Sequence, residues 1–151
     1  PEATWGLFYA RHRVRPYLAA SGIEPAGRRT LDRLLERLEA GDYDDDAPPA
    51  RIHGDLWSGN TLFTATGVVV IDPAAHGGHR ITDLAMLSLF GSSELRVILD
   101  AYAAASRWLP DDWRDLVPLH QVHPLLVHAS LFGGGYGQRA VRAAEQALAA
   151  R

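Results

Sequence analysis

The chain has 151 residues, 47% of them hydrophobic and 22% charged, and its formal net charge is −3. This size and composition are typical of one soluble globular domain. The net charge gives no support for nucleic-acid binding, which needs a basic surface. Cysteine is absent, so disulfides and thiolate metal sites are excluded. No signal peptide and no apolar run of membrane-spanning length is evident, and we expect a cytoplasmic protein.

The N-terminal segment has the pattern of a helix that contains a proline. Trp5, Phe8 and Tyr9 recur at helical spacing, and we expect the helix to run to about Ser21. Because Pro16 has no backbone N–H to donate, it should interrupt or kink this helix.

A second helix is predicted over 30–41, where leucines recur at helical offsets. Thr30 is the expected N-cap and Gly41 the expected residue just after the helix. The acidic, proline-bearing segment 42–50 has the composition of a solvated linker. Its carboxylates lack the glycine-turn spacing of a calcium loop, so we do not interpret them as a metal site.

The segment 53–60, HGDLWSGN, is the clearest indication of chemistry in the chain. It places Asp55 five residues before Asn60, and Asp72 follows at the end of an apolar run. Phosphoryl-transfer catalytic loops have this order: an aspartate that receives or orients the hydroxyl proton, then an asparagine and a later aspartate that bind magnesium. The residues on either side of the TATG sequence suit a β-hairpin, which would hold Asp72 beside the loop.

The rest of the chain is predicted to be helical. Asp83 is the expected N-cap of a short apolar helix that ends at Gly91. Three further helices are expected, over 93–108, 111–132 and 137–151. Pro118 and Pro124 lie inside the second of these, which should therefore form two pieces or one kinked helix.

Together these motifs resemble the fructosamine kinase family, which belongs to the aminoglycoside phosphotransferase branch of the protein-kinase-like fold. HGDxxxxN with a downstream IDP marks the broad superfamily, whereas Trp57 and the LFGGGYG sequence at 131–137 point to this family. The opening TWGLFYARHRVRP at 4–16 is similar to the aromatic, Arg-rich helix with which the family begins its larger lobe. One departure is visible: Ile81 follows the GHR sequence, where the family usually has a glutamate.

The resemblance implies a fold and an activity. The fold would be α+β and mostly helical: the C-terminal catalytic lobe of a protein-kinase-like fold, with a small β-hairpin that carries the metal-binding Asp72. The activity would be transfer of the γ-phosphoryl group of ATP, with Mg²⁺, to a sugar hydroxyl of a small ketoamine or a glycated protein. Asp55 would be the catalytic base, and Asn60 and Asp72 would bind Mg²⁺ and, through it, the nucleotide.

Five further residues would support that site. The acceptor would contact the aromatic face of Trp57, and the resemblance adds Gly134 and Tyr136 from the glycine-rich segment. His53 is expected to be structural, with hydrogen bonds to backbone near the loop, because the chemistry already has its aspartate. By the same resemblance, Asp83 would brace the backbone of the catalytic loop.

All fifteen Lys and Arg positions are arginine, so the chain has no lysine. A kinase of this class needs a lysine from its small lobe to pair with the α- and β-phosphates. We therefore expect residues 1–151 to form a single C-terminal lobe, without the small nucleotide-binding lobe and inactive alone. The surface that a second lobe would cover, near Trp5 and Phe8 and around Trp57, should then promote self-association.

Other interpretations remain open. In the first, the fold is the same but the acceptor is an aminoglycoside, choline or a similar alcohol. In the second, the chain is a non-catalytic ligand-binding module. A zinc site is less favoured, because HGGH lies in a glycine-rich loop without a fixed third ligand. The histidines that suggest it are His76, His79, His120, His123 and His128.

Overall fold

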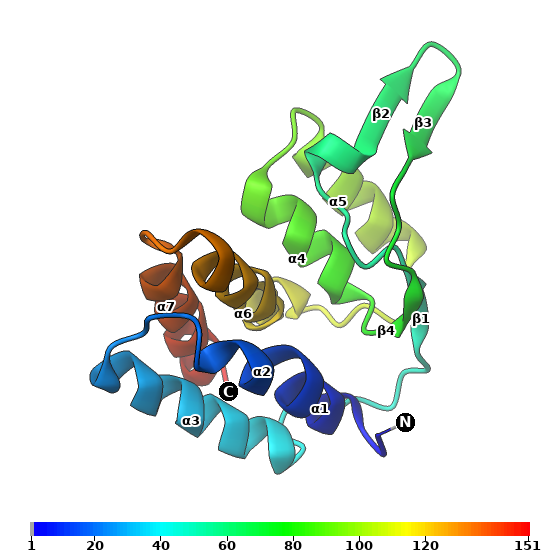
Figure 1. The fold of residues 1–151 in the computed structure, drawn as a ribbon. Helices are drawn as coiled ribbons and strands as arrows, with labels where there is room; N and C mark the ends of the chain where they lie inside the picture. The colour runs from blue at the N-terminus through cyan, green and yellow to red at the C-terminus, as the bar shows by residue number, and fades with distance from the viewer. Residues whose placement is uncertain (1) are drawn as a thin grey trace. The chain divides into compact units, whose positions relative to one another are not determined.

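The computed structural model describes residues 2–151. Within them the chain is mostly helical with two small antiparallel sheets, an α+β architecture (Figure 1). It forms two compact units, one made of the residues up to Asp46 together with Pro118–Arg151, the other of Ala47–Val117. Among residues 2–151, no helix combines the length and the hydrophobicity that a membrane crossing requires.

The first unit is built from helices. Its N-terminal stretch consists of α1, the π-helical turn η1 and α2, and α3, the larger part of α6 and α7 complete it. The bounds of these six elements are Trp5–Phe8, Tyr9–Val14, Arg15–Leu18, Pro25–Glu39, Trp113–Phe132 and Tyr136–Ala149.

The N-terminal stretch shows what a proline does to a helix. Pro16 cannot donate a backbone hydrogen bond, and just before it the bonding pattern widens, so that the Arg15 N–H bonds to the Ala10 carbonyl five residues back. This widening is a π-helical turn. The predicted helix with an interruption is confirmed, although it ends at Leu18, before the expected Ser21.

The long helix α6 is a single helix, not two pieces, although Pro118 and Pro124 lie inside it. The Tyr9 hydroxyl donates to the Leu119 carbonyl at 2.8 Å and accepts from the His123 N–H at 3.1 Å. Those two groups are the pair that an undisturbed α-helix joins directly. Tyr9 therefore satisfies backbone groups of α6 with a buried hydroxyl, and burial raises the pKa of Tyr9.

The two ends of α3 differ in how well the sequence predicts them. The helix begins at Pro25, so Thr30 lies inside it and the prediction that Thr30 is the N-cap is wrong. Proline suits the first turn, where its missing N–H would have no helical partner anyway. The other end is confirmed: Gly41 has a φ of +86°, and the Asp42 N–H bonds to the Arg37 carbonyl, which is the Schellman arrangement.

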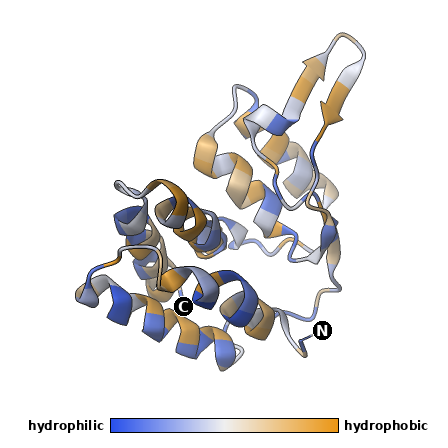
Figure 2. Cartoon of the chain, in the orientation of Figure 1, coloured by the Kyte–Doolittle hydropathy of each residue, from blue (hydrophilic) through white to orange (hydrophobic). Residues whose placement is uncertain are grey.

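The apolar faces of α3 and α7 pack together and form much of the first unit's core. Leucines come from α3 and alanines from α7, and each is buried; they are Leu31, Leu34, Leu35, Leu38, Ala140, Ala143, Ala144 and Ala147. Small residues let the helices approach closely, because a Cβ on Gly27 would lie 2.6 Å from a methyl carbon of Val141. Figure 2 shows the hydrophilic and hydrophobic sides of α3.

The acidic segment after α3 is only partly the solvated linker that its composition predicts. Tyr43 is buried, and its hydroxyl donates to the Ala147 carbonyl at 3.0 Å. Asp44 accepts from the Gly6 N–H at 2.7 Å, which ties the segment to α1. Charge dominates the composition here, but one aromatic side chain anchors the segment on the core.

The second unit contains both small sheets. β1 pairs with β4 and β2 with β3, all antiparallel; the bounds in chain order are Ala50–Ile52, Thr61–Thr64, Gly67–Val70 and His76–Gly78. The β2–β3 hairpin, with Ala65 and Thr66 as its loop, confirms the prediction made around TATG. The sequence does not predict the β1–β4 pair, because three-residue strands are too short to show an alternating pattern.

Two helices follow the strands of this unit, α4 at Ile81–Phe90 and α5 at Leu95–Ala105. α4 ends at Gly91 as predicted, with φ +76°. It begins before Asp83, so the prediction that Asp83 is the N-cap is wrong. Asp83 lies in the first turn of α4, and its carboxylate accepts from the backbone N–H groups of His53 and Gly54. α5 lies inside the expected segment 93–108 but is shorter.

Candidate functional site

The loop between β1 and β2 begins with two backbone N–H groups that share one carboxylate. Asp83 Oδ2 accepts from the His53 N–H at 2.6 Å, and Oδ1 accepts from the Gly54 N–H at 2.9 Å. Both bonds are charge-assisted, so the start of the loop is fixed to α4 at two points. Gly54 has a φ of +83°, and a Cβ there would overlap the Ala74 carbonyl oxygen, so only glycine fits.

His53 joins the loop to the end of the β-hairpin. Its Nδ1 accepts from the Asp55 N–H at 3.3 Å, and this leaves Nε2 to donate to the Ile71 carbonyl at 2.9 Å. Both ring nitrogens are therefore engaged with backbone atoms of this unit. The structure places the side chain as a brace between Asp55 and the residue before Asp72.

Asn60, at the end of the same loop, is buried, and its side chain binds back to Asp55. Its Nδ2 donates to the Asp55 carbonyl at 2.9 Å and to the Asp55 carboxylate Oδ2 at 3.0 Å. The Asn60 carbonyl accepts from the Ile71 N–H at 3.1 Å. Asp55 and Asn60 are thus in direct contact. Asn60 is also bonded to Ile71, and Asp72 is the residue that follows Ile71 in the chain.

Asp72 has an unusual backbone. Its φ is +51°, and it is the one non-glycine residue with positive φ among residues 2–151. Side chains with a Cβ seldom adopt this conformation, and when they do it is often at a functional site. The Asp72 side chain is exposed, so its carboxylate is accessible to solvent.

The residues at this loop fit a magnesium ion by the chemistry of their atoms. Mg²⁺ takes oxygen ligands, commonly one or two carboxylates with the remaining positions held by water and phosphate. Asp72 offers an exposed carboxylate. Asn60 uses its Nδ2 for Asp55, so its side-chain oxygen is the atom that remains for a cation.

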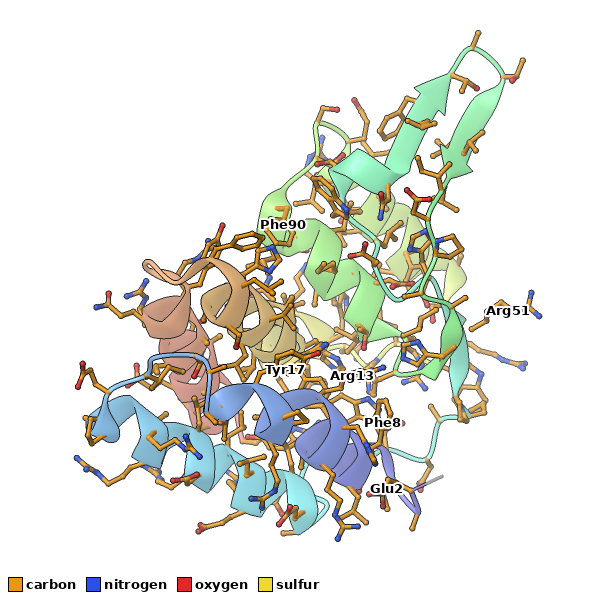
Figure 3. The ribbon with its side chains drawn as sticks, viewed as in Figure 1. Glu2, Phe8, Arg13, Tyr17, Arg51 and Phe90 are labelled. Atoms are coloured by element: carbon orange, nitrogen blue, oxygen red, sulfur yellow. The ribbon has the colours of Figure 1, made fainter. Side chains whose placement is uncertain are left out.

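Trp57 lies in the same loop with 40% of its surface exposed. Its ring meets the edge of Phe90, which Figure 3 labels near the end of α4, at 6.2 Å between centroids and 65° between planes. A Cβ on Gly59 would overlap the indole, so the ring lies directly over that glycine. Phe90 and Gly59 thus hold an aromatic side chain that still presents surface to solvent.

Gly134 and Tyr136 belong to the first unit, whereas the loop belongs to the second, so one unit does not bring all the predicted residues together. Gly133 and Gly134 have φ of +65° and +62°, and a Cβ on either would meet nothing within 4 Å. The glycines therefore serve the backbone conformation and not close packing. Tyr136 lies against His128, with 5.1 Å between ring centroids, and the Arg139 guanidinium lies 5.6 Å from its centroid.

Sequence reasoning missed Gly54, Gly59 and Phe90. The two glycines stand inside the HGDLWSGN motif and signal tight backbone there, but a sequence does not show what would collide with a side chain. Phe90 gives no signal, since it ends an apolar helix like many core residues. Ile81, the departure from the family pattern, is fully buried, and its N–H donates to His79 Nδ1 at 3.2 Å.

Four of the histidines considered for zinc, His76, His79, His123 and His128, have Nδ1 atoms that contact backbone groups. Examples are His76 with the Ala74 carbonyl, 2.9 Å, and His128 with the Pro124 carbonyl, 2.7 Å. Within residues 2–151 no group of three or more His, Cys, Asp or Glu side chains is arranged to hold a metal ion.

Comparison with known proteins gives consistent matches along the whole chain. The family model described as fructosamine kinase matches residues 1–150. The probable ketoamine kinase YniA of Escherichia coli strain K12 is 33% identical over 149 residues, which are 99% of this chain and 51% of that protein. A probable ketoamine kinase of Lactiplantibacillus plantarum is 35% identical over 141 residues, 90% of this chain and 50% of that protein.

Among solved structures, the chain is similar to a Thermobifida fusca protein provisionally named a fructosamine-3-kinase. The two are 48% identical, with a TM-score of 0.90 over 99% of this chain and 52% of that one. The chain therefore spans about half the length of each of these three relatives.

Proposed function

The chain belongs to the fructosamine kinase family, and from that premise we propose that it is the C-terminal, catalytic lobe of an ATP-dependent small-molecule kinase. The acceptor is a sugar hydroxyl of a ketoamine, either a small molecule or a glycated protein. The observation that carries the proposal is the direct contact of Asp55 with Asn60, and the bond from Asn60 to the residue before Asp72. One compact loop thus gathers the residue types that phosphoryl transfer uses.

Asp55 is the base or the group that orients the acceptor hydroxyl. Asn60 holds the Asp55 Oδ2 atom and the Asp55 carbonyl, so the carboxylate has a fixed rotamer and the Oδ1 atom remains to accept a proton. Fixing such a group before substrate binds reduces the cost of reaching the reactive geometry. His53 and Asp83 are positioning residues, since they bind backbone of the loop.

Asn60 and Asp72 would hold Mg²⁺ through side-chain oxygens. When bound, the ion neutralises charge on the phosphates of ATP. The left-handed backbone of Asp72 supports this assignment, because strained conformations are kept where function needs a particular direction of a side chain. Asn60 would have a double task, since its nitrogen holds Asp55 and its oxygen would bind the cation.

Trp57 is the proposed platform for the acceptor. An exposed indole offers an apolar face to a sugar ring, and Gly59 and Phe90 keep this one in place. Gly134 and Tyr136 are proposed as further acceptor contacts. The names of the relatives, probable ketoamine kinases, favour a ketoamine over an aminoglycoside or choline.

The 151-residue chain alone is expected to be inactive. It contains no lysine to pair with the phosphates of ATP, and it spans about half the length of the relatives named above. We place the protein in the cytoplasm, where ATP is available. Robust turnover of a ketoamine by the purified chain, lost in Asp55→Ala, would contradict the part of the proposal that treats it as an incomplete enzyme.

The catalytic assignment is tested in a longer protein that contains these residues together with the remaining half of the family's length. Asp55→Ala should lower kcat by about 10²- to 10⁴-fold, the range for loss of a general base, with little change in the affinity for ATP. Asp111→Ala is the matched control, because Asp111 is an exposed aspartate of the same unit. Equal rates in all three proteins would exclude Asp55 as the base.

A further inference from the structure

The backbone carbonyl of Trp57 accepts two hydrogen bonds. The Asn60 N–H donates to it at 3.0 Å, and the Thr61 hydroxyl donates to it at 3.1 Å. The first bond closes the 3₁₀ turn η2, Ser58–Asn60, and any turn of this kind makes it. The second bond comes from a side chain, so it depends on which residue stands at position 61.

The Thr61 hydroxyl is a donor whose place is fixed by the hairpin. Thr61 is buried, and its N–H bonds to the Ser58 carbonyl. As the first residue of β2 it lies opposite Val70 of β3 in the antiparallel ladder (Figure 1). Its branched side chain has few rotamers to choose from. The donor is therefore in position without any movement of the loop.

The indole of Trp57 is held less specifically than its backbone. The ring lies over Gly59, and Phe90 meets its edge, while 40% of the residue is exposed. Such apolar contacts have no preferred direction, whereas a hydrogen bond sets a distance and an angle. The two bonds to the carbonyl thus decide from which point, and in which direction, the ring starts.

We propose that Thr61 is a positioning residue for the acceptor: its hydroxyl holds the backbone of Trp57, so that the indole stays where a sugar ring stacks on it. This inference rests on the proposed function, because it needs Trp57 to be the acceptor platform. It goes further by tying that platform to β2, the strand that pairs with β3, and β3 leads to Asp72. One hairpin thus positions both the acceptor platform and the aspartate proposed for the metal.

The metal side of the site does not depend on the Thr61 hydroxyl. Asn60 keeps two bonds from its Nδ2 to Asp55, and its carbonyl keeps the bond from the Ile71 N–H. Its own N–H also still reaches the Trp57 carbonyl. Loss of the hydroxyl therefore loosens the platform and leaves the base and the proposed magnesium ligands in place. The expected signature is weaker binding of the acceptor with an unchanged requirement for Mg²⁺.

The test uses steady-state kinetics of a longer protein that contains these residues together with the remaining half of the family's length, with fructosyl-lysine as the ketoamine. Thr61→Val removes the hydroxyl and keeps the branched shape. It should raise the KM for fructosyl-lysine about two- to tenfold, the effect of one neutral hydrogen bond. The kcat, the KM for ATP and the Mg²⁺ concentration for half-maximal rate should stay at their wild-type values, because only acceptor binding is weakened.

Three further variants serve as controls. Thr61→Ser keeps the hydroxyl and should keep the wild-type KM for fructosyl-lysine. Thr64→Val makes the same substitution at the other end of β2, where the hydroxyl donates to the Gly67 carbonyl at 2.8 Å, and it should leave that KM unchanged. Thr61→Ala also lacks the hydroxyl, so it gives the answer if circular dichroism shows that Thr61→Val does not fold.

A double variant separates this inference from the platform on which it rests. Because Thr61 acts through Trp57, Thr61→Val combined with Trp57→Ala should raise the KM for fructosyl-lysine no further than Trp57→Ala alone. If Trp57→Ala raised the KM but Thr61→Val and Thr61→Ala did not, the inference would be overturned and the platform would stand. A wild-type KM in Trp57→Ala would remove the platform and the inference with it.

Three other results would also overturn the inference. Effects of Thr61→Val and Trp57→Ala that add in the double variant would mean that Thr61 acts by another route. An equally raised KM in Thr61→Ser would show that the shape of the side chain matters and the hydroxyl does not. A raised Mg²⁺ requirement in Thr61→Val would assign the residue to the metal side of the site.

Discussion

Both units of the chain bury apolar side chains, but they differ in how much of each unit this burial holds in place. In the first, α3 contributes four leucines that are at most 1% exposed, and they pack on small residues of α7. In the second, α4 buries four apolar residues, but the β2–β3 hairpin is largely exposed and α5 has no buried residue. The loop between β1 and β2 in this unit is fixed by hydrogen bonds that involve the side chains of Asp83, His53 and Asn60.

This difference shows how the chain separates stability from positioning. Apolar burial is strong but has no direction, and it is suited to holding helices together. Hydrogen bonds contribute less net free energy each, but they set distances and angles. A site that must place a carboxylate within a fraction of an ångström therefore needs polar braces on rigid elements, and these are concentrated on one loop.

The largest expected effect breaks the first unit. Leu35→Ala removes an α3 side chain that is 1% exposed in the core of the first unit, and it should lower the free energy of unfolding by about 2–5 kcal/mol. Urea unfolding followed by circular dichroism measures it. Val69→Ala on the hairpin is the control and should cost far less, because Val69 is already 49% exposed. Similar losses at both sites would contradict the comparison.

The next effect concerns the second unit. Asp83→Ala removes the acceptor of two backbone N–H groups, at His53 and Gly54, and charge-assisted bonds of this kind contribute roughly 1.5–3 kcal/mol each. Amide exchange at Gly54 should accelerate strongly while exchange within α3 stays unchanged. If the Gly54 amide kept its protection in the variant, the carboxylate would not be what fixes the loop.

A smaller effect is expected at Tyr9. Tyr9→Phe removes a hydroxyl that serves the Leu119 carbonyl and the His123 N–H, and it should cost about 1–3 kcal/mol, the range for buried groups left without partners. Thermal unfolding gives the value, with Tyr102→Phe as control, because Tyr102 is exposed. A cost as low as that of the control would mean that the two groups of α6 close directly onto each other.

The smallest effect is a dependence on alkaline pH. Burial raises the pKa of Tyr9, and burial likewise raises the pKa of Tyr43. A pKa that is higher in the folded than in the unfolded chain contributes stability that is complete below pH ~10, the unfolded value, and declines as the pH rises above it. The decline is at most about 1.4 kcal/mol per pH unit for each group.

Urea unfolding at pH 8 and at pH 11 measures this decline. The wild type should lose stability between the two values, and Tyr9→Phe should lose less, since one buried phenol is gone. An equal loss in both proteins would show that the Tyr9 hydroxyl ionises as easily in the folded chain as in the unfolded one.

The sequence predicts those features that local chemistry decides. Gly41 ends α3 because a left-handed residue is needed there, and TATG forms the hairpin loop because short turns favour glycine. The order of Asp55, Asn60 and Asp72 is read directly from the motif. The roles proposed for these three side chains remain predictions, since no ligand contact tests them.

Features decided by distant parts of the chain are harder to predict. Tyr43 lies in a segment whose composition indicates solvent, yet its hydroxyl binds the Ala147 carbonyl far along the chain. Asp83 resembles an N-cap locally, but α4 begins before it and its carboxylate reaches the loop at His53. In both cases a tertiary partner, invisible in the local pattern, decides where the side chain goes.

The most direct test of the catalytic assignment compares two variants of a longer protein that contains this lobe. The rate of ATP-dependent ketoamine phosphorylation is measured as a function of Mg²⁺ concentration at saturating ATP and acceptor. Asp72→Asn should slow the reaction and raise the Mg²⁺ concentration needed for half-maximal rate, whereas Asp55→Ala should slow it without changing that concentration. Wild-type rates in both variants, or the same Mg²⁺ shift in both, would contradict the division of roles between the two aspartates.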